Sequence, residues 1–268
     1  MVTSKFIHLH HLVHLLGFNN MQTIYIGNTL INDIYLENKR MDDVISGQEQ
    51  VPQNGLVAWY DASNAASYPG SGTTWTDISP SAGSGTIVGS PTFNSTTKLF
   101  TFSGSQRVDL SLFLPSGQAT YSYFVIANAT GGSVTQVFGQ GTETTNRRGF
   151  MIRHTGYYGF NGLNNDINNP TGMDVSNNQL KSIAFTLDIN AASALRFYLN
   201  GAFISTGNTN AGSSNLNLGT TAARIGSNAG NGEGFIGDIG VCIVYDRVLT
   251  DDEISKINAY YSTKYTLV

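Results

Sequence analysis

The sequence predicts an all-β chain closed by one short helix, and three features near its C-terminal end carry that prediction. Apolar and polar residues alternate from Leu195 to Asn200, which is the period-two pattern of a half-buried strand. Asn200-Gly201 favours the positive φ angles of a type I′ turn, so Phe203-Ile204 is expected to return as the second strand of a hairpin. Thr250 to Glu253 has the sequence of a capping box, and apolar residues follow it at helical spacing.

Between the hairpin and the helix, the segment from Gly237 to Tyr245 predicts one more strand. Its residues Ile239, Val241, Ile243 and Tyr245 recur at every second position, so we expect them to share one face.

The order of these elements resembles the laminin G-like, concanavalin A-like lectin and glucanase superfamily. Gly55–Ser79 resembles the opening strand and loop of such domains as they occur in phage and other virion-associated proteins. Lys98–Leu110 resembles a strand pair of the family, and Leu180–Gly201 resembles its central hairpin. The resemblance spans Gly55 to Tyr265 and implies a jelly-roll β-sandwich of two antiparallel sheets. It says less about function, because this architecture hosts lectins, glycanases, adhesion modules and spacers.

The composition indicates a neutral surface rich in hydroxyl and amide groups. Charged residues make up 12% of the 268 residues, about half the usual ~25%, and the formal charge is -4. Nucleic acid is not an expected partner because no basic cluster is present, and no apolar run is long enough to span a membrane.

The lone cysteine, Cys242, excludes an intramolecular disulfide and favours synthesis in a reducing cytoplasm. We expect it to be a buried small hydrophobe rather than a nucleophile.

Residues 1–20 form a leader of a different kind, expected to be helical or disordered. It holds most of the chain's five histidines among apolar residues, and His10 and His14 have the spacing of a metal-binding pair on a helix. No carboxylate or cysteine accompanies them. A solvated amphipathic leader, a signal peptide, and an upstream artefact before Met21 are the alternatives.

Residues 21–50 contain a short internal repeat and a linker. Ile24–Asp33 and Ile34–Asp43 each read as a β-hairpin that begins with Ile-Tyr-aliphatic. Such short hairpins do not bury a core alone, so they need a partner surface. They either dock on another subunit or pack on the chain's own sandwich, which is expected over residues 51–268. The docking residues are Ile24, Ile26, Ile34 and Leu36.

Catalysis is not expected from the carboxylates of this chain. Glucanases of the resembled superfamily carry Glu-x-Asp-x-x-Glu on one strand, so that an acid and a nucleophile flank the scissile bond. No glutamate stands in that pattern; Glu253 is explained by helix capping, and Glu143 and Glu233 stand alone in loops. Candidates for a carboxylate pair are Asp61, Asp77 and Asp109, each of which also reads as a turn residue.

The sequence contains more residues suited to glycan binding than to catalysis. Sugars are recognised by aromatic rings and by amide or carboxylate groups on their hydroxyls, and one predicted hairpin with its following loop gathers both kinds of group. Its candidate ligand-binding residues are Tyr157, Tyr158, Asn161, Asn164 and Asn165. These residues also read as core and turn positions.

A second long loop adds Trp75 and Tyr68 as candidate ligand contacts, with Trp75 alternatively anchoring that loop to a sheet. No cofactor is required. The laminin G-like resemblance implies a calcium at the rim of the domain, and Asp166 and Asp174 would supply oxygens of the kind that calcium prefers; a solvated acidic loop is the alternative.

These observations lead to one functional hypothesis. The chain is expected to be a non-enzymatic surface accessory protein of a bacterial virus, made in the host cytoplasm and mounted on the virion. Its partners would be other virion proteins, further copies of itself and a cell-surface glycan, bound weakly but with avidity. A purely architectural decoration protein and a polysaccharide-cleaving enzyme are the alternatives.

Overall fold

The computed structural model describes two units, residues 1–49 and 50–268. It gives backbone and side chains for residues 51–111, 120–132, 136–140, 178–188, 195–206, 223–227 and 233–268. It gives the backbone of strand segments at residues 24–26, 29–31, 35–36, 39–40, 117–118, 148–153, 157–162, 167–168, 207 and 217–218.

The first unit contains two short antiparallel hairpins. Strand β1 (Ile24–Ile26) pairs with β2 (Thr29–Ile31), and β3 (Tyr35–Leu36) pairs with β4 (Lys39–Arg40). Both hairpins begin in the Ile-Tyr-aliphatic segments of the sequence repeat, which confirms the predicted appendage. Ile34 lies outside the described residues.

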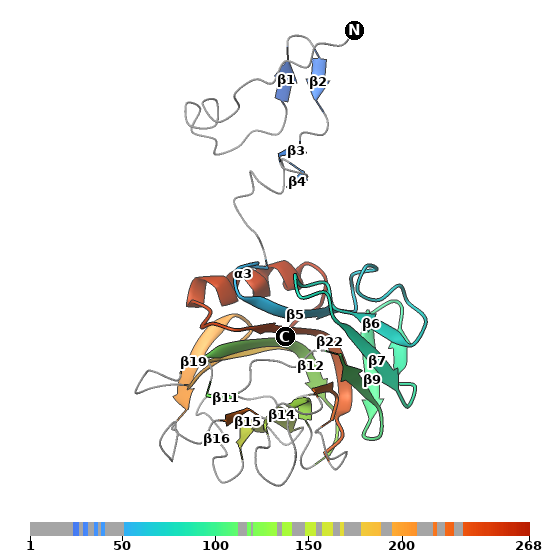
Figure 1. The fold of residues 1–268 in the computed structure, drawn as a ribbon, viewed down its shortest axis with the longest axis vertical. Helices are drawn as coiled ribbons and strands as arrows, with labels where there is room; N and C mark the ends of the chain where they lie inside the picture. Colours follow the sequence, from blue (N-terminus) through green and yellow to red (C-terminus); the bar gives the residue numbers. More distant parts are fainter. Residues whose placement is uncertain are drawn as a thin grey trace. The chain divides into compact units, whose positions relative to one another are not determined.

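The second unit is a sandwich of two eight-stranded antiparallel sheets (Figure 1). The first sheet has the order β19-β18-β17-β12-β22-β9-β8, with β5 also paired to β22. Its strands are β5 (Leu56–Asp61), β8 (Thr92–Asn94), β9 (Leu99–Ser103), β12 (Tyr121–Ala129), β17 (Lys181–Leu187), β18 (Leu195–Leu199), β19 (Ala202–Gly207) and β22 (Ile236–Tyr245).

The second sheet has the order β16-β15-β14-β13-β21-β10-β7-β6. Its strands are β6 (Thr74–Thr76), β7 (Ser84–Val88), β10 (Arg107–Leu110), β13 (Gln136–Gln140), β14 (Arg148–Arg153), β15 (Tyr157–Gly162), β16 (Ile167–Asn168) and β21 (Arg224–Ile225). A separate pair joins β11 (Gly117–Gln118) to β20 (Asn217–Leu218). This arrangement confirms the predicted all-β sandwich.

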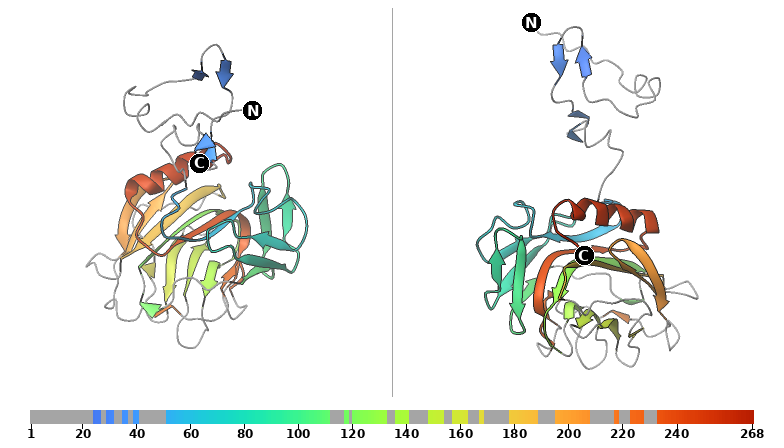
Figure 2. Two further views of the ribbon diagram at one scale, coloured as in Figure 1. Left: turned by 45° about the horizontal axis from the view of Figure 1, so that its top comes forward. Right: turned by 180° about the vertical axis from the view of Figure 1, so that it is seen from behind.

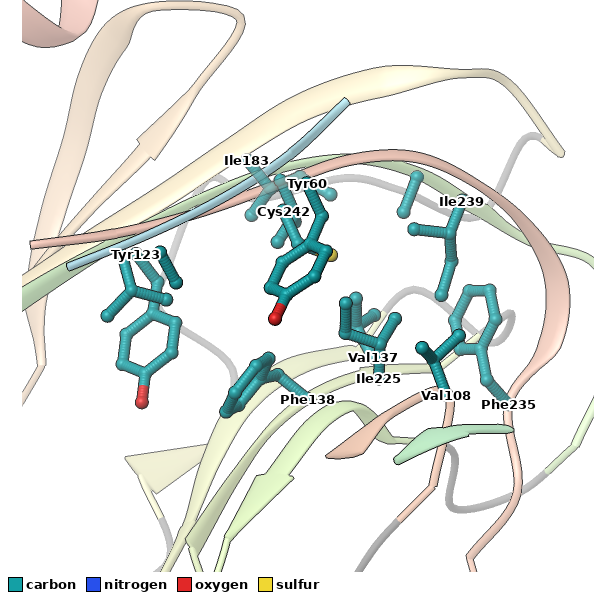
Figure 3. Close-up of a cluster of buried hydrophobic side chains, with 14 of the residues drawn as sticks. Tyr60, Val108, Tyr123, Val137, Phe138, Ile183, Ile225, Phe235, Ile239 and Cys242 are labelled. Carbon is teal, nitrogen blue, oxygen red and sulfur yellow. The ribbon is translucent and has the colours of Figure 1, made fainter. Parts of the chain in front are cut away.

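The main core lies between the two sheets. Figure 3 shows Tyr60, Tyr123 and Ile183 of the first sheet directed toward Phe138 and Ile225 of the second. These side chains are at most 4% exposed. Burial of large apolar side chains is worth about 1.5 to 3 kcal/mol each, so this layer dominates the stability of the sandwich.

A second core lies on the opposite face of the first sheet, under helix α3 (Asp251–Ser262). Ile254, Ile257 and Tyr261 of the helix are fully buried against residues such as Phe124 and Ile243. Both views of Figure 2 show α3, in red, lying along this sheet. The central strands of the first sheet are therefore buried on both faces, and every residue of β17 is buried.

The local signals of the C-terminal region are confirmed. Asn200 and Gly201 have φ angles of 47° and 79°, as the type I′ turn requires. Thr250 caps the helix by accepting a hydrogen bond from the Glu253 backbone N–H, while the Glu253 side chain accepts one from the Thr250 backbone N–H.

The predicted face of strand β22 is wrong at one residue. Val241, Ile243 and Tyr245 pack under the helix, whereas Ile239 packs between the sheets. Ile126 pairs with Val241 and the next residue of β12 pairs with Ile239, so Gly240 is an extra residue. This β-bulge reverses the alternation of the strand.

Cys242 lies between the sheets, 1% exposed and unpaired, as expected of a small buried hydrophobe. Burial raises the pKa of its thiol, which keeps the thiol protonated and unreactive.

Candidate functional site

A pocket of about 350 Å³ opens between two loops of the sandwich. One wall is the long loop that follows β5, and the other is the turn between β8 and β9. The side chains that give the pocket its chemistry are Ser63, Tyr68, Ser71, Phe93, Ser95 and Lys98. We call it the loop pocket. Its volume is at the small end of the roughly 300 to 1,000 Å³ typical of ligand sites.

The aromatic residues that line the loop pocket are Tyr68 and Phe93, and both pack against Phe100 of the main core. Tyr68 lies edge-on to Phe93 and Phe100, with ring centroids 4.8 Å and 4.7 Å away. Phe100 is in the main core, and Phe93 is half-buried at the pocket. Such edge-to-face contacts fix ring orientation, so the pocket has a preformed aromatic wall.

Tyr68 contributes a polar atom as well as its ring. Its hydroxyl donates a hydrogen bond of 3.3 Å to the Gly72 carbonyl. Burial raises the pKa of Tyr68, so its phenol stays neutral throughout the physiological range.

Short hydrogen bonds hold the long loop against the sandwich. Ser67 is fully buried; its hydroxyl donates to the Thr76 carbonyl (2.6 Å) and accepts from the Asp61 backbone N–H (3.0 Å). The Asn64 carbonyl accepts from the backbone N–H groups of Ser67 and Tyr68. Because these contacts close a turn at the start of the loop, the Tyr68 ring is positioned by the fold.

Lys98 supplies the positive charge of the loop pocket from the β8–β9 turn. Its backbone is in the left-handed region at φ 58°. Its N–H donates to the Asn94 carbonyl (2.8 Å), and its carbonyl accepts from the Tyr265 hydroxyl (3.3 Å). The backbone of this exposed lysine is therefore fixed on both sides.

The buried carboxylate of Asp61 lies behind the Ser63 wall. Its Oδ1 accepts from the Ser63 backbone N–H (2.8 Å) and hydroxyl (2.6 Å), and its Oδ2 accepts from the Tyr261 hydroxyl (3.1 Å). Lys264 Nζ is 3.8 Å from Oδ2. Asp61 thus supports the loop from inside, and its charge is compensated there rather than in the loop pocket.

Sequence comparison assigns the family. A model described as Laminin_G_3, Concanavalin A-like lectin/glucanases superfamily, matches residues 102–255, more than half of the chain. The chain belongs to the concanavalin A-like lectin/glucanase superfamily. No curated protein sequence matches it.

Solved structures similar to this superfamily member share its fold. Domain 4 of AbnA, a GH43 extracellular arabinanase from Geobacillus stearothermophilus solved with arabinotriose, has a TM-score of 0.59 at 19% identity, covering 77% of this chain and 100% of that domain. A botulinum neurotoxin type C structure, titled for cell entry that depends on two ganglioside molecules, has a TM-score of 0.58 at 11% identity. It covers 77% of this chain and 51% of the toxin chain.

A Trypanosoma rangeli sialidase in complex with sialic acid has a TM-score of 0.56 at 15% identity, covering 81% of this chain and 34% of the sialidase. This chain therefore spans about half of the toxin and a third of the sialidase. Chains of the fold include glycoside hydrolases as well as glycan-binding domains, so the fold alone does not decide between them.

The candidate catalytic aspartates of this superfamily member have structural partners. Asp77 is buried, and its carboxylate accepts from the backbone N–H groups of Trp59 (2.8 Å), Ser79 (2.8 Å) and Gly83 (3.3 Å). Asp109 Oδ1 bridges the Nε atoms of two arginines, each at 2.9 Å, which are Arg107 and Arg224.

Two of the glutamates are also in contacts of the fold. Glu253 takes a two-pronged ion pair from Arg247, with distances of 2.6 Å and 2.8 Å, which together with capping lowers its pKa. Glu233 accepts a hydrogen bond from the Gln136 side chain. Glu143 lies outside the described residues.

The prediction that Trp75 contacts a ligand is wrong. It is 0% exposed, with its ring centroid 5.9 Å from that of Tyr60 and 4.7 Å from that of Phe100. No face of the indole is open to a sugar, because the side chain anchors β6 in the main core. Tyr68, the other candidate from this region, does line the loop pocket.

Of the remaining candidate residues, some lie in a strand whose backbone alone is described, and the others lie outside the described residues. Tyr157, Tyr158 and Asn161 are in β15, where they pair with Arg153, Ile152 and Gly149 of β14. Outside the described residues lie Asn164, Asn165, Asp166 and Asp174. The part of the chain that is described holds no cluster of three metal-binding side chains, and none of its helices is long and apolar enough to cross a membrane.

Sequence reasoning did not identify Phe93 or Lys98. The signal available was the turn chemistry of Asn94 between two strands: its side-chain oxygen accepts from the backbone N–H groups of Thr96 (2.9 Å) and Thr97 (3.1 Å). That pattern predicts a hairpin, but it does not say which other loop the hairpin meets.

Proposed function

We propose that the sandwich is a non-catalytic carbohydrate-binding module and that the loop pocket is its ligand site. The observation that carries the proposal is the meeting of a fixed aromatic wall with three serine hydroxyls and one ammonium in a pocket of about 350 Å³. Aromatic rings pack on the C–H faces of sugars, and hydroxyl and ammonium groups hydrogen-bond to sugar oxygens.

The relatives support a carbohydrate ligand. Similar structures carry arabinotriose and sialic acid, and a similar toxin depends on gangliosides for cell entry.

The described carboxylates support binding without catalysis. Asp61, Asp77, Asp109 and Glu253 are all held in hydrogen bonds or ion pairs of the fold, whereas glycoside hydrolysis needs two carboxyl groups facing the scissile bond.

The test is sugar binding by the full-length chain, measured by saturation-transfer NMR and on a glycan array, with reducing-sugar release assayed in parallel. Phe93→Ala should abolish the saturation transfer, because Phe93 is the half-buried ring of the loop pocket. Phe203→Ala is the matched control, since Phe203 is 42% exposed and does not line the loop pocket. Binding that survives Phe93→Ala, or no binding at all, would contradict this site.

We further propose that this module acts on the surface of a bacterial virus, made in the host cytoplasm and mounted on the particle beside other virion proteins and further copies of itself. The resemblance of Gly55–Ser79 to virion-associated domains supports this setting. Many weak sites on one particle would bind a cell-surface glycan with avidity. Residues 21–50 would provide the docking segment.

Docking can be tested through the segment's apolar residues. Ile34→Asp places a charge in the proposed contact and should prevent incorporation into particles, measured by mass spectrometry of purified virions. Its thermal midpoint should be unchanged. Normal incorporation with a lowered midpoint would show that the hairpins pack on the sandwich instead. Particles that incorporate the chain but bind no glycan would favour a purely architectural decoration protein.

A further inference from the structure

The loop pocket has one ionic group on its wall, and that group is a cation. The described residues that line the pocket include Lys98 and no carboxylate. Among the described residues, none forms an ion pair with Lys98. The chain as a whole has a formal charge of -4, so the charge at the loop pocket is opposite in sign to the net charge of the chain.

The carboxylate of Asp61, which accepts hydrogen bonds from Ser63 of the pocket wall, is already compensated. Asp61 is 0% exposed, and its carboxylate receives the Ser63 and Tyr261 hydroxyls and faces Lys264. Asp61 therefore does not satisfy the ammonium of Lys98. A cation left without a carboxylate at a pocket is available to an anionic ligand.

The backbone of Lys98 is consistent with a role for its side chain. A residue at φ 58° is strained unless it is glycine or asparagine, which adopt this conformation at little cost. The turn itself needs neither an amine nor a long side chain, since its hydrogen bonds come from Asn94 and from backbone groups. A lysine at this position costs stability that a glycine would not cost.

We infer that the loop pocket selects sugars that carry a carboxylate, such as uronic or nonulosonic acids, through a charge-assisted hydrogen bond from Lys98 Nζ. This inference rests on the proposed function and adds its ligand class. Phe93, the half-buried ring of the aromatic wall, would contact the sugar ring with Tyr68 packed against it, and the serine hydroxyls would contact its neutral oxygens. The carboxylate would lie at the Lys98 side of the pocket.

The experiment compares methyl glycosides that differ only at C6: glucoside with glucuronide, galactoside with galacturonide and mannoside with mannuronide. Each is titrated into the full-length chain and followed by NMR at low and high salt. For at least one pair we expect the acid to bind about tenfold more tightly than its neutral partner at low salt. This preference should shrink as salt rises, because the ion pair is partly exposed.

Variants of Lys98 assign the preference to its ammonium. Lys98→Gln should bring the acid-to-neutral ratio close to one, because the amide keeps a hydrogen-bond donor but carries no charge. Lys256→Gln is the matched control, because Lys256 pairs with Asp252 on helix α3 outside the loop pocket and should leave the ratio unchanged. Lys98→Gly should also lose the preference while keeping or raising the thermal midpoint, since glycine relaxes the backbone at this position.

The outcomes separate this inference from the proposed function. Neutral and acidic sugars that bind equally, with both lost in Phe93→Ala, would overturn the carboxylate preference and leave carbohydrate binding standing. An acid preference that survives Lys98→Gln would overturn the role of Lys98. Absence of binding for every pair would overturn the proposed function and the inference with it.

Discussion

Trp59 Nε1 donates a hydrogen bond of 2.8 Å to the hydroxyl of Tyr261, although the two residues are 202 positions apart in the sequence. Trp59 is in the opening strand β5, and Tyr261 is in the closing helix α3. The same hydroxyl donates to the buried carboxylate of Asp61. One phenol thus joins the first strand of the sandwich, its last helix and the support of the loop pocket.

Removing the hydroxyl of Tyr261 should destabilise the whole sandwich. Tyr261→Phe removes one hydrogen-bond partner from the Asp61 carboxylate and one from the indole Nε1–H of Trp59, and unsatisfied buried polar groups cost about 1 to 3 kcal/mol. The free energy of unfolding, measured in urea, should fall by about that amount. Tyr260→Phe is the control, because the Tyr260 hydroxyl contacts only the exposed Lys264 amine among the described residues. Equal losses in the two variants would contradict a central role for Tyr261.

Stability should fall as the pH rises above 10. Burial, followed by a hydrogen bond to Asp251 (2.8 Å), raises the pKa of Tyr198 from 10.0 to about 12. Between these two values the unfolded chain has lost the Tyr198 proton while the folded chain keeps it, so the free energy of unfolding decreases with rising pH. Burial also raises the pKa of Tyr60, Tyr261 and Tyr265, which act in the same direction.

Urea midpoints at pH 8, 10, 11 and 12 measure this loss. Tyr198→Phe should be less stable than the natural chain at pH 8, where it lacks the Asp251 hydrogen bond, and should lose less stability between pH 10 and 12. A variant whose midpoints run parallel to those of the natural chain would show that Tyr198 does not titrate in this window.

Substitution of Trp75 separates anchoring from ligand contact. Trp75→Ala should cost about 3 to 5 kcal/mol of stability, because the indole fills the main core at 0% exposure. Trp75→Phe should cost less, since it keeps an aromatic ring and removes an indole N–H that has no hydrogen-bond partner among the described residues. Sugar binding by the folded Phe variant, followed by NMR, should be unchanged. A selective loss of binding would restore Trp75 as a ligand contact.

A fragment of residues 50–268 should unfold cooperatively on heating, because the main and helix-side cores lie within it. A fragment that begins at Gly55 should have a lower midpoint. It lacks Val51, which is 4% exposed under the helix, and the carbonyl of Gln53 that accepts from the Leu56 N–H. Circular dichroism of both fragments gives the comparison, and equal midpoints would show that residues 50–54 contribute nothing.

We propose a test of calcium binding by Asp166 and Asp174, for which a solvated acidic loop is the alternative. A site with a dissociation constant of about 0.1 mM would add about 2.7 kcal/mol at 10 mM calcium, seen as a rise in thermal midpoint that EDTA reverses. Replacing both aspartates with asparagine should remove the rise. The proposal fails if the natural chain shows no rise, or if the double variant keeps it.

The sequence predicted the features that short segments encode. The Asn200-Gly201 hairpin and the Thr250 capping box depend on neighbouring residues alone, and both form as expected. The bulge at Gly240 was missed because it depends on how β22 pairs with β12, which is more than 100 positions away in the chain. Alternation in one strand cannot reveal an extra residue relative to its partner.

The loop pocket could be predicted only in part, for the same reason. Tyr68 was identified from the residue types of its own loop, and Trp75 was identified beside it although it points into the core. The opposite wall, with Phe93 and Lys98, comes from a hairpin that the sequence does not link to that loop. Side-chain direction and the meeting of two loops are tertiary properties, so composition and spacing do not determine them.

The burial of Cys242 makes its thiol a natural probe of how often the sandwich opens. The thiol belongs to the middle strand β22, with Tyr60 of β5 and Val125 of β12 as its register neighbours. A thiol reagent reaches it only when these strands separate, and the chain has no other cysteine to react. The rate of labelling of the natural chain therefore reports how often the centre of the sandwich opens, without any introduced probe.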